Sequence, residues 1–169
     1  MLDSRLGTTI GDYLLFKLGK ELTDQGHRLS GNLIRSLEYK VRTKTQDLIL
    51  EFLANEYGEE LNTGVPASKI PRYPSLEYLR LVRDLARYAT QRMGLRGKAA
   101  KSAGHAIVRA WQREGKPTRA SYRFSKNGRR TGWVDYTLLN EEETINEFIE
   151  DFVGRELELL ITEFIKQAA

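Results

Sequence analysis

The stretch that decides the fold is Leu29-Ser30-Gly31-Asn32-Leu33-Ile34-Arg35-Ser36-Leu37-Glu38-Tyr39-Lys40-Val41. After a Ser-Gly break and a short apolar step, its last residues alternate strictly between apolar and polar side chains. Leu37, Tyr39 and Val41 share one side of this alternation. A period of two is typical of a half-buried β-strand. The stretch therefore predicts a strand near residues 36–42.

A second strand is predicted at residues 47–54. Leu48, Leu50 and Phe52 occupy one of its faces, and the other face is also largely apolar. A polar turn at residues 43–47 separates the two strands, so they pair most simply as an antiparallel hairpin. Because the second strand is apolar on nearly both faces, we expect other elements to cover it on each side.

An amphipathic helix is predicted before the strands, at residues 9–26, with Thr9 as a candidate N-cap. Gly19 lies inside this helix, where glycine costs about 1 kcal/mol relative to alanine. It marks either a close approach to another backbone or an ordinary weak point, and both interpretations stay open. The apolar stripe recurs at every fourth position and consists of Ile10, Leu14, Leu18 and Leu22.

Two further helices are predicted in the middle of the chain, at residues 75–93 and 98–113. They follow a loop at residues 62–74, which holds all but one of the prolines. This loop is either an arm toward a neighbour or a plain surface connection. Ser75 is the expected N-cap of the first helix. The expected buried residues are Leu79, Val82, Ala86, Ala89 and Met93 in the first helix, and Ala103, Ile107, Ala110 and Trp111 in the second.

A β-hairpin is predicted at residues 119–136. Its signal is Asn127-Gly128, because Asn-Gly is the strongest short indication of a two-residue hairpin turn. Short segments that contain aromatic residues flank this turn on both sides. Lys126, Arg129 and Arg130 would give the hairpin a cationic tip.

A long helix is predicted at residues 141–167, with Asn140 as N-cap and Glu143 completing a capping box. Its apolar face runs from Ile145 to Ile165, which is too long for a small sheet to cover, so we expect part of it to pack against a partner. The whole pattern predicts a single α+β domain over residues 1–169. In this domain the N-terminal and C-terminal helices lie over a small, mainly antiparallel sheet, with two more helices in the middle.

The composition excludes several classes of functional site. The chain has no cysteine, only two histidines and no glycine motif for phosphate or dinucleotide binding. We therefore expect no enzymatic activity, no metal and no cofactor. No apolar run approaches the roughly 18 residues that a membrane span needs, so we expect no membrane partner.

The charge is strongly segregated along the chain, although the net charge is only +4. Residues 80–130 hold fifteen Lys and Arg against two acids, a net charge of +13. Residues 131–169 hold ten acids against two bases, a net charge of −8. Arg80, Arg83 and Arg87 line up on one side of their helix. Such a molecule can pair with copies of itself, or can turn its basic region toward nucleic acid.

A family resemblance rests on the order of these features. An amphipathic helix is followed by the step Ser30-Gly31-Asn32-Leu33-Ile34-Arg35-Ser36-Leu37 into a strand, and then by a Tyr…Gly element at residues 57–64 before the proline loop. Residues 106–115 add a helix that ends at a glycine. In these features the chain resembles the neck, or tail-completion, proteins of long-tailed bacteriophages, which join the head connector to the tail.

The resemblance implies a structural virion protein without enzymatic activity, in which several copies form a ring around the DNA channel. Its implied partners are further copies of itself, the neighbouring connector and tail proteins, and packaged DNA contacted without sequence specificity. The implied location is the virion neck or tail, after assembly in the host cytoplasm. Copy number and the role as adaptor, stopper or tail terminator stay open. The candidate inter-subunit or DNA-facing residues are Arg80, Arg83, Arg87, Lys126, Arg129 and Arg130.

The alternative function is a non-enzymatic nucleic-acid-binding protein that acts through the basic residues 80–130. Aromatic residues are interleaved with the basic ones there, and arginine contacts to phosphate combined with base stacking would suffice for such binding. The interleaved aromatic residues are Tyr88, Trp111, Tyr122, Phe124 and Trp133.

Overall fold

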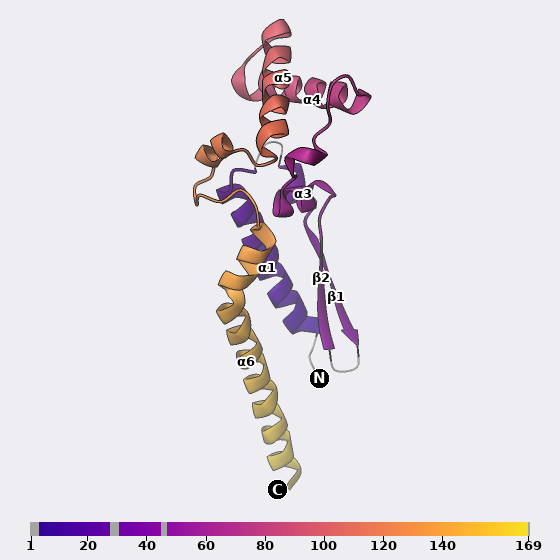
Figure 1. Cartoon of the computed structure of the whole chain (residues 1–169). Coiled ribbons are helices and arrows are strands. Elements are labelled where there is room, and N and C mark those ends of the chain that lie inside the picture. Colours follow the sequence, from indigo (N-terminus) through magenta and orange to yellow (C-terminus); the bar gives the residue numbers. More distant parts are fainter. Residues whose placement is uncertain (1–3, 28–30, 45–46, 169) are drawn as a thin grey trace. The chain divides into compact units, whose positions relative to one another are not determined.

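The computed structural model describes residues 4–27, 31–44 and 47–168, and its architecture is α+β as expected (Figure 1). In chain order the elements are α1 (Ser4–Asp24), α2 (Asn32–Arg35), β1 (Glu38–Lys44), β2 (Asp47–Leu53), α3 (Tyr57–Thr63), the 3-10 helix η1 (Ala67–Lys69), α4 (Leu76–Met93), α5 (Gly97–Glu114), the 3-10 helix η2 (Arg119–Phe124) and α6 (Trp133–Ala168).

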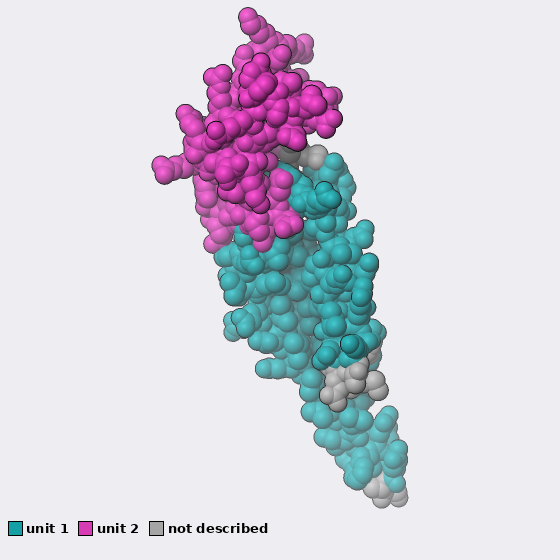
Figure 2. All heavy atoms as spheres, turned by 45° about the vertical axis from the view of Figure 1, so that its right-hand side comes forward, with its two compact units in different colours: residues 1–58, 132–169 teal, residues 59–131 magenta. Residues whose placement is uncertain are grey.

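The chain forms two compact units, whereas the sequence predicted a single domain over residues 1–169 (Figure 2). Unit 1 comprises residues 1–58 and 132–169, and unit 2 comprises residues 59–131. Each unit has its own cluster of buried apolar side chains, one around α1 and one around α4. The division follows from these separate cores, because each core draws together only the elements that supply its side chains.

The fold-deciding stretch forms a short helical turn before the strand begins. Leu33 and Leu37 lie four residues apart, and both are buried. The Ser36 hydroxyl donates a hydrogen bond to the carbonyl of Leu33 (2.8 Å) and so closes the turn of α2. Strand β1 therefore starts at Glu38, two residues later than expected. Leu29 and Ser30, which begin the stretch, lie outside the described residues.

Strands β1 and β2 form the expected antiparallel hairpin, with a register that runs from Glu38 opposite Leu53 to Lys44 opposite Asp47. The alternation is confirmed, because Tyr39 and Val41 are half-buried while their neighbours in the strand are exposed. One expectation fails: the second face of β2 is not fully covered. Ile49 on that face is 44% exposed.

Helix α1 lies between the hairpin and α6 within unit 1 (Figure 1). Two glycines allow its backbone to approach β1 closely. A Cβ on Gly7 would lie 2.5 Å from Val41 Cγ1, and one on Gly11 would lie 2.3 Å from Tyr39 Cε2. At Gly19 the nearest atom would be at an ordinary 3.5 Å, so its interpretation as a close approach is wrong. The predicted stripe is confirmed, since Ile10, Leu14, Leu18 and Leu22 are all buried.

Helix α6 begins at Trp133, eight residues earlier than predicted. Asn140 is therefore not an N-cap. It lies inside the helix, where its Nδ2 donates to the carbonyl of Tyr136 (2.8 Å). Trp133 and Thr137 are buried one turn apart, and the Trp133 indole Nε1 donates to the carbonyl of Gly58 (3.1 Å). Burying the tryptophan side chain stabilises the fold by more than a helix cap, which is worth about 1 kcal/mol.

The predicted hairpin at residues 119–136 is absent, and this prediction was wrong. Residues 119–124 form η2, and α6 takes over the segment that was expected to form the second strand. Between them the Asn127 side-chain oxygen accepts hydrogen bonds from the Ser125 hydroxyl (2.8 Å) and from the backbone amide of Arg129 (3.1 Å). This side-chain-to-backbone turn competes with a two-residue hairpin turn, since both use Asn and a glycine with positive φ.

Unit 2 is built on the helix pair α4–α5. Ser75 is the N-cap of α4 as predicted, because its hydroxyl accepts a hydrogen bond from the amide of Tyr78 (3.2 Å). The predicted burial of Val82 and Ala89 in α4 is confirmed, but the rest of the predicted face is wrong, and in α5 the buried side is shifted by about one residue. Leu79 and Met93 are 46% and 50% exposed. The buried residues are Tyr78, Val82, Leu85 and Ala89 in α4, and Ala100, Gly104 and Val108 in α5.

Candidate assembly surfaces

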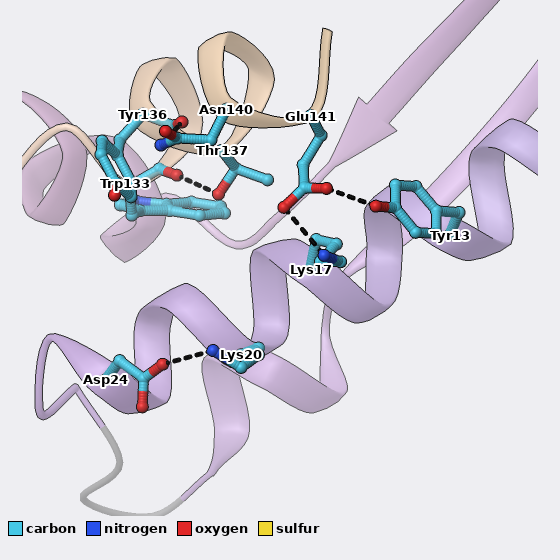
Figure 3. Close-up of polar contacts among 9 residues, drawn as sticks. All are labelled: Tyr13, Lys17, Lys20, Asp24, Trp133, Tyr136, Thr137, Asn140 and Glu141. Carbon is cyan, nitrogen blue, oxygen red and sulfur yellow. Dashed lines mark hydrogen bonds and ion pairs between the residues drawn. The ribbon is translucent and has the colours of Figure 1, made fainter. Parts of the chain in front are cut away.

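The first half of α6 is fixed to α1 by a polar contact beside their apolar interface (Figure 3). The Tyr13 hydroxyl donates a hydrogen bond to one carboxylate oxygen of Glu141, and Lys17 Nζ lies 2.9 Å from the other. The side chains of Lys17 and Glu141 are only 29% and 16% exposed. Charge-assisted hydrogen bonds to both oxygens restrict the geometry more than a single contact does. This contact therefore fixes which side of α6 faces α1.

The surroundings hold both members of this ion pair in their charged forms. Burial by itself would raise the pKa of Glu141, but hydrogen bonds from Tyr13 and Lys17 and the nearby positive charge outweigh it, so the pKa lies below its usual 4.5. The hydrogen bond to Glu141 raises the pKa of Lys17 above its usual 10.5. A pair shifted in these two directions stabilises the folded state near neutral pH.

The contact between α1 and α6 extends over several turns. Ile145, Phe148, Ile149 and Phe152 of α6 pack against the buried leucine and isoleucine side chains near the start of α1. The rings of Tyr13 and Phe148 meet edge to face at 5.2 Å. The exposed ion pair between Arg5 and Glu156 (3.3 Å) marks the far end of this contact.

Beyond Phe152 the apolar face of α6 continues without a covering element among the described residues. This segment is called the apolar end below. Figure 1 shows it extending past the start of α1. The apolar end consists of Val153 (42% exposed), Leu157 (53%), Leu160 (61%), Ile161 (58%), Phe164 (73%) and Ile165 (61%), and Leu159 (60%) adds an apolar side chain on another side of the helix.

Arg80, Arg83 and Arg87 lie together on the exposed side of α4, as their spacing predicted. This surface is called the basic face below. The side chains of Arg83 and Arg87 are 61% and 70% exposed and lie 3.5 and 3.7 Å from the carboxylate of Asp84. Exposed ion pairs at such distances contribute little, because water screens them. The basic face therefore retains its capacity to contact an acidic partner.

Lys126, Arg129 and Arg130 do not form the tip of a hairpin. They belong to the loop between η2 and α6, in which Lys126 is exposed and the two arginines are half-buried. The Ser125 hydroxyl accepts a hydrogen bond from the backbone amide of Arg129 (3.1 Å). These residues therefore lie on a different segment from the basic face, and the two arginines are less exposed than a hairpin tip would make them.

The aromatic residues expected to stack on bases have different surroundings. Trp133 is buried in unit 1, and Trp111 packs against the core of unit 2, with Lys116 Nζ 4.6 Å from its ring centre. Tyr122 and Phe124 are 42% and 55% exposed. Trp111 and Trp133, two of the five predicted stacking residues, are thus part of the packed structure. The rings of Tyr122 and Phe124 remain accessible.

Three contacts were not anticipated from the sequence. A Cβ on Gly104 would lie 2.6 Å from the carbonyl oxygen of Val82, so this glycine allows α4 and α5 to touch. Tyr78 and His105 share a hydrogen bond of 2.8 Å between the same helices. The third contact is the indole hydrogen bond of Trp133 described above. A glycine or histidine inside a helical pattern carries no directional signal, which is why sequence reasoning passed over the first two.

Comparison with protein-family models, curated proteins and solved structures finds no match to this chain. Among the described residues, no group of three or more His, Asp or Glu could hold a metal ion. None of the described helices is long and apolar enough to cross a membrane.

Proposed function

We propose that this chain is a structural subunit of a bacteriophage neck, which assembles as a ring of several copies and joins the head connector to the tail. The observation that carries this proposal is the apolar end of α6. Six large apolar side chains on one face, each between 42% and 73% exposed, form a contiguous surface. Such a surface on a water-facing helix indicates a contact with another protein.

The segregated charge supports assembly from identical copies. The net charge of +13 lies in residues 80–130, which all belong to unit 2, and the net charge of −8 lies in residues 131–169, which contain α6. Opposite charges on different parts of one chain favour a head-to-tail contact between copies. A contact of this kind closes into a ring when the rotation between neighbours permits it. The resemblance of residues 30–37 and 57–64 to neck proteins points in the same direction.

The proposal is tested with phage particles produced without this chain. We expect electron microscopy to show DNA-filled heads and separate tails, and purified chain added to the two should join them. Particles that are fully assembled without the chain would exclude a joining role. Native mass spectrometry of the purified chain provides an independent test, because a ring-forming subunit should give one closed oligomer that dissociates as salt screens its charges.

The second candidate function is nucleic-acid binding without sequence specificity. The exposed arginines of α4, together with the accessible rings of Tyr122 and Phe124, favour it. A titration with single-stranded and double-stranded DNA at several salt concentrations distinguishes it from the first. Binding through phosphates predicts a linear fall of log affinity with log salt, with a slope of about −0.9 for each phosphate neutralised on duplex DNA. A slope near zero, or no binding at low salt, would exclude this function.

A further inference from the structure

We propose that the apolar end of α6 in one copy docks on the basic face of α4 in a second copy of the chain. The proposal rests on the assembly proposed above and specifies the contact through which the copies meet. Three observations support it. Both surfaces carry exposed apolar side chains, they are similar in length, and their charges are opposite in sign.

The exposed side of α4 is not purely basic. Leu76 and Leu79 stand on it together with the three arginines, and they are 73% and 46% exposed. Residues three, four, seven and eleven positions apart share one side of a helix, so these five side chains form one strip. A strip that combines two exposed leucines with arginines can bury apolar surface and pair with acids in the same contact.

The apolar end of α6 has the complementary composition. Its apolar side chains recur at intervals of three and four residues from Val153 to Ile165. Glu158 lies along one edge of this strip, and Glu156 and Glu163 lie along the other. Glu156 is already paired with Arg5, which leaves Glu158 and Glu163 as the flanking acids for an external contact.

The lengths of the two strips also match. From Val153 to Ile165 the axis of α6 rises about 18 Å, and from Leu76 to Arg87 the axis of α4 rises about 17 Å, at 1.5 Å per residue. Two helices of this kind can therefore lie against each other along the whole length of both strips, with Leu76 and Leu79 supplying the apolar contact at one end of the strip on α4. The arginines of one then lie beside the glutamates of the other.

A pairing of two apolar ends with each other is less favourable on charge. It would bring the flanking glutamates of both copies to the same interface, and like charges placed against each other destabilise a contact. The basic face offers apolar surface with the opposite charge. For this reason the inference commits to α4 of a second copy as the occupant.

A charge exchange between copies tests the contact directly. The double variant Arg83→Glu/Arg87→Glu makes the strip on α4 acidic, and Glu158→Lys/Glu163→Lys makes the strip on α6 basic. Each variant alone places like charges together, so we expect its self-association measured by analytical ultracentrifugation to weaken at least about tenfold. In an equimolar mixture every contact between unlike copies regains opposite charges. We expect association to return, and native mass spectrometry to show complexes with equal numbers of the two variants.

Matched control variants carry the same changes in charge at other exposed positions. Lys98→Glu/Lys101→Glu reverses two cations on α5, and Glu142→Lys/Glu143→Lys reverses two acids near the start of α6. We expect both controls to associate like the unchanged chain. Circular dichroism of all four variants verifies that each one is folded.

Several results would overturn the contact. One is self-association of the α4 variant that matches the unchanged chain, which would indicate pairing between apolar ends. Another is a mixture that associates no better than its separate components. A chain that stays monomeric at every concentration also overturns it. The particle experiment described above is independent of these results, so failure of this contact and failure of the joining role can be distinguished.

Discussion

The two helix pairs of this protein are held together in different ways. In α1–α6, large apolar side chains meet along several turns, and the ion pair of Lys17 with Glu141 fixes their alignment. In α4–α5, the backbones approach each other at Gly104, and the hydrogen bond between Tyr78 and His105 lies nearby. Side-chain stripes can therefore be recognised in a sequence, whereas a backbone contact through glycine depends on a partner that the local pattern does not reveal.

Of the changes considered, adding a side chain at Gly104 should have the largest effect on stability. A Cβ at position 104 would lie 2.6 Å from the Val82 carbonyl oxygen and 3.2 Å from the Ala86 nitrogen, and neither backbone atom can move alone. We expect Gly104→Ala to destabilise unit 2 by about 2 kcal/mol, as overpacking outweighs the gain in helix propensity. Amide exchange followed by mass spectrometry should show faster exchange in α4 and α5.

The control for this variant is Gly154→Ala in α6. A Cβ at this position has no heavy atom within 4 Å, apart from the neighbouring residues and the backbone of its own helix turns. We therefore expect the control to slow exchange in α6, in line with a gain of up to about 1 kcal/mol in helix propensity. Equal stabilisation by the two substitutions would mean that α4 and α5 do not touch at Gly104.

Removing the charge that aligns α1 with α6 should have an intermediate effect. Glu141→Gln keeps an oxygen for the Tyr13 hydroxyl but loses the attraction to Lys17. At neutral pH we expect a loss of about 1–2 kcal/mol from unit 1, measured by urea unfolding monitored through amide exchange in α1. The exposed Glu142→Gln serves as the control and should change little.

The same variant has a predicted pH dependence. The pKa of Glu141 lies below 4.5 in the folded chain, so its contribution is present above pH 4.5 and is lost as the pH falls through the folded pKa. The pKa of Lys17 lies above 10.5, so its contribution is present below pH 10.5 and is lost as the pH rises through the folded pKa. The difference in stability between the unchanged chain and Glu141→Gln should therefore shrink at both low and high pH. A difference that does not change with pH would mean that the ion pair is not its cause.

Removing the cap of α4 should have the smallest of these effects. The Ser75 hydroxyl accepts a hydrogen bond from the amide of Tyr78, and Ser75→Ala leaves this amide without that acceptor. We expect a loss of about 1 kcal/mol, seen as faster exchange of the Tyr78 amide. Ser75→Asp retains an acceptor and should exchange like the unchanged chain. If the two variants exchange alike, the cap does not stabilise α4.

The sequence was most informative where one local pattern sufficed. The stripe from Ile10 to Leu22, the alternation through Tyr39 and Val41, and the cap at Ser75 all occur in the structure as predicted. Of the candidate residues, the three arginines of α4 share an exposed face as their spacing indicated. The loop residues Lys126, Arg129 and Arg130 were assigned to the wrong local structure, because Asn-Gly serves several kinds of turn.

Periodicity and composition thus determined the class of fold, the presence of α1 and of the hairpin β1–β2, and the segregation of charge. Packing decided the rest. Burial of Trp133 against Gly58 started α6 early and replaced the predicted hairpin, since burying a tryptophan outweighs local preferences of about 1 kcal/mol. The extent of α1 decided which half of α6 is covered and which half is left exposed at Leu160 and Phe164. Contacts between residues distant in the chain depend on where the whole backbone runs, which a local pattern does not encode.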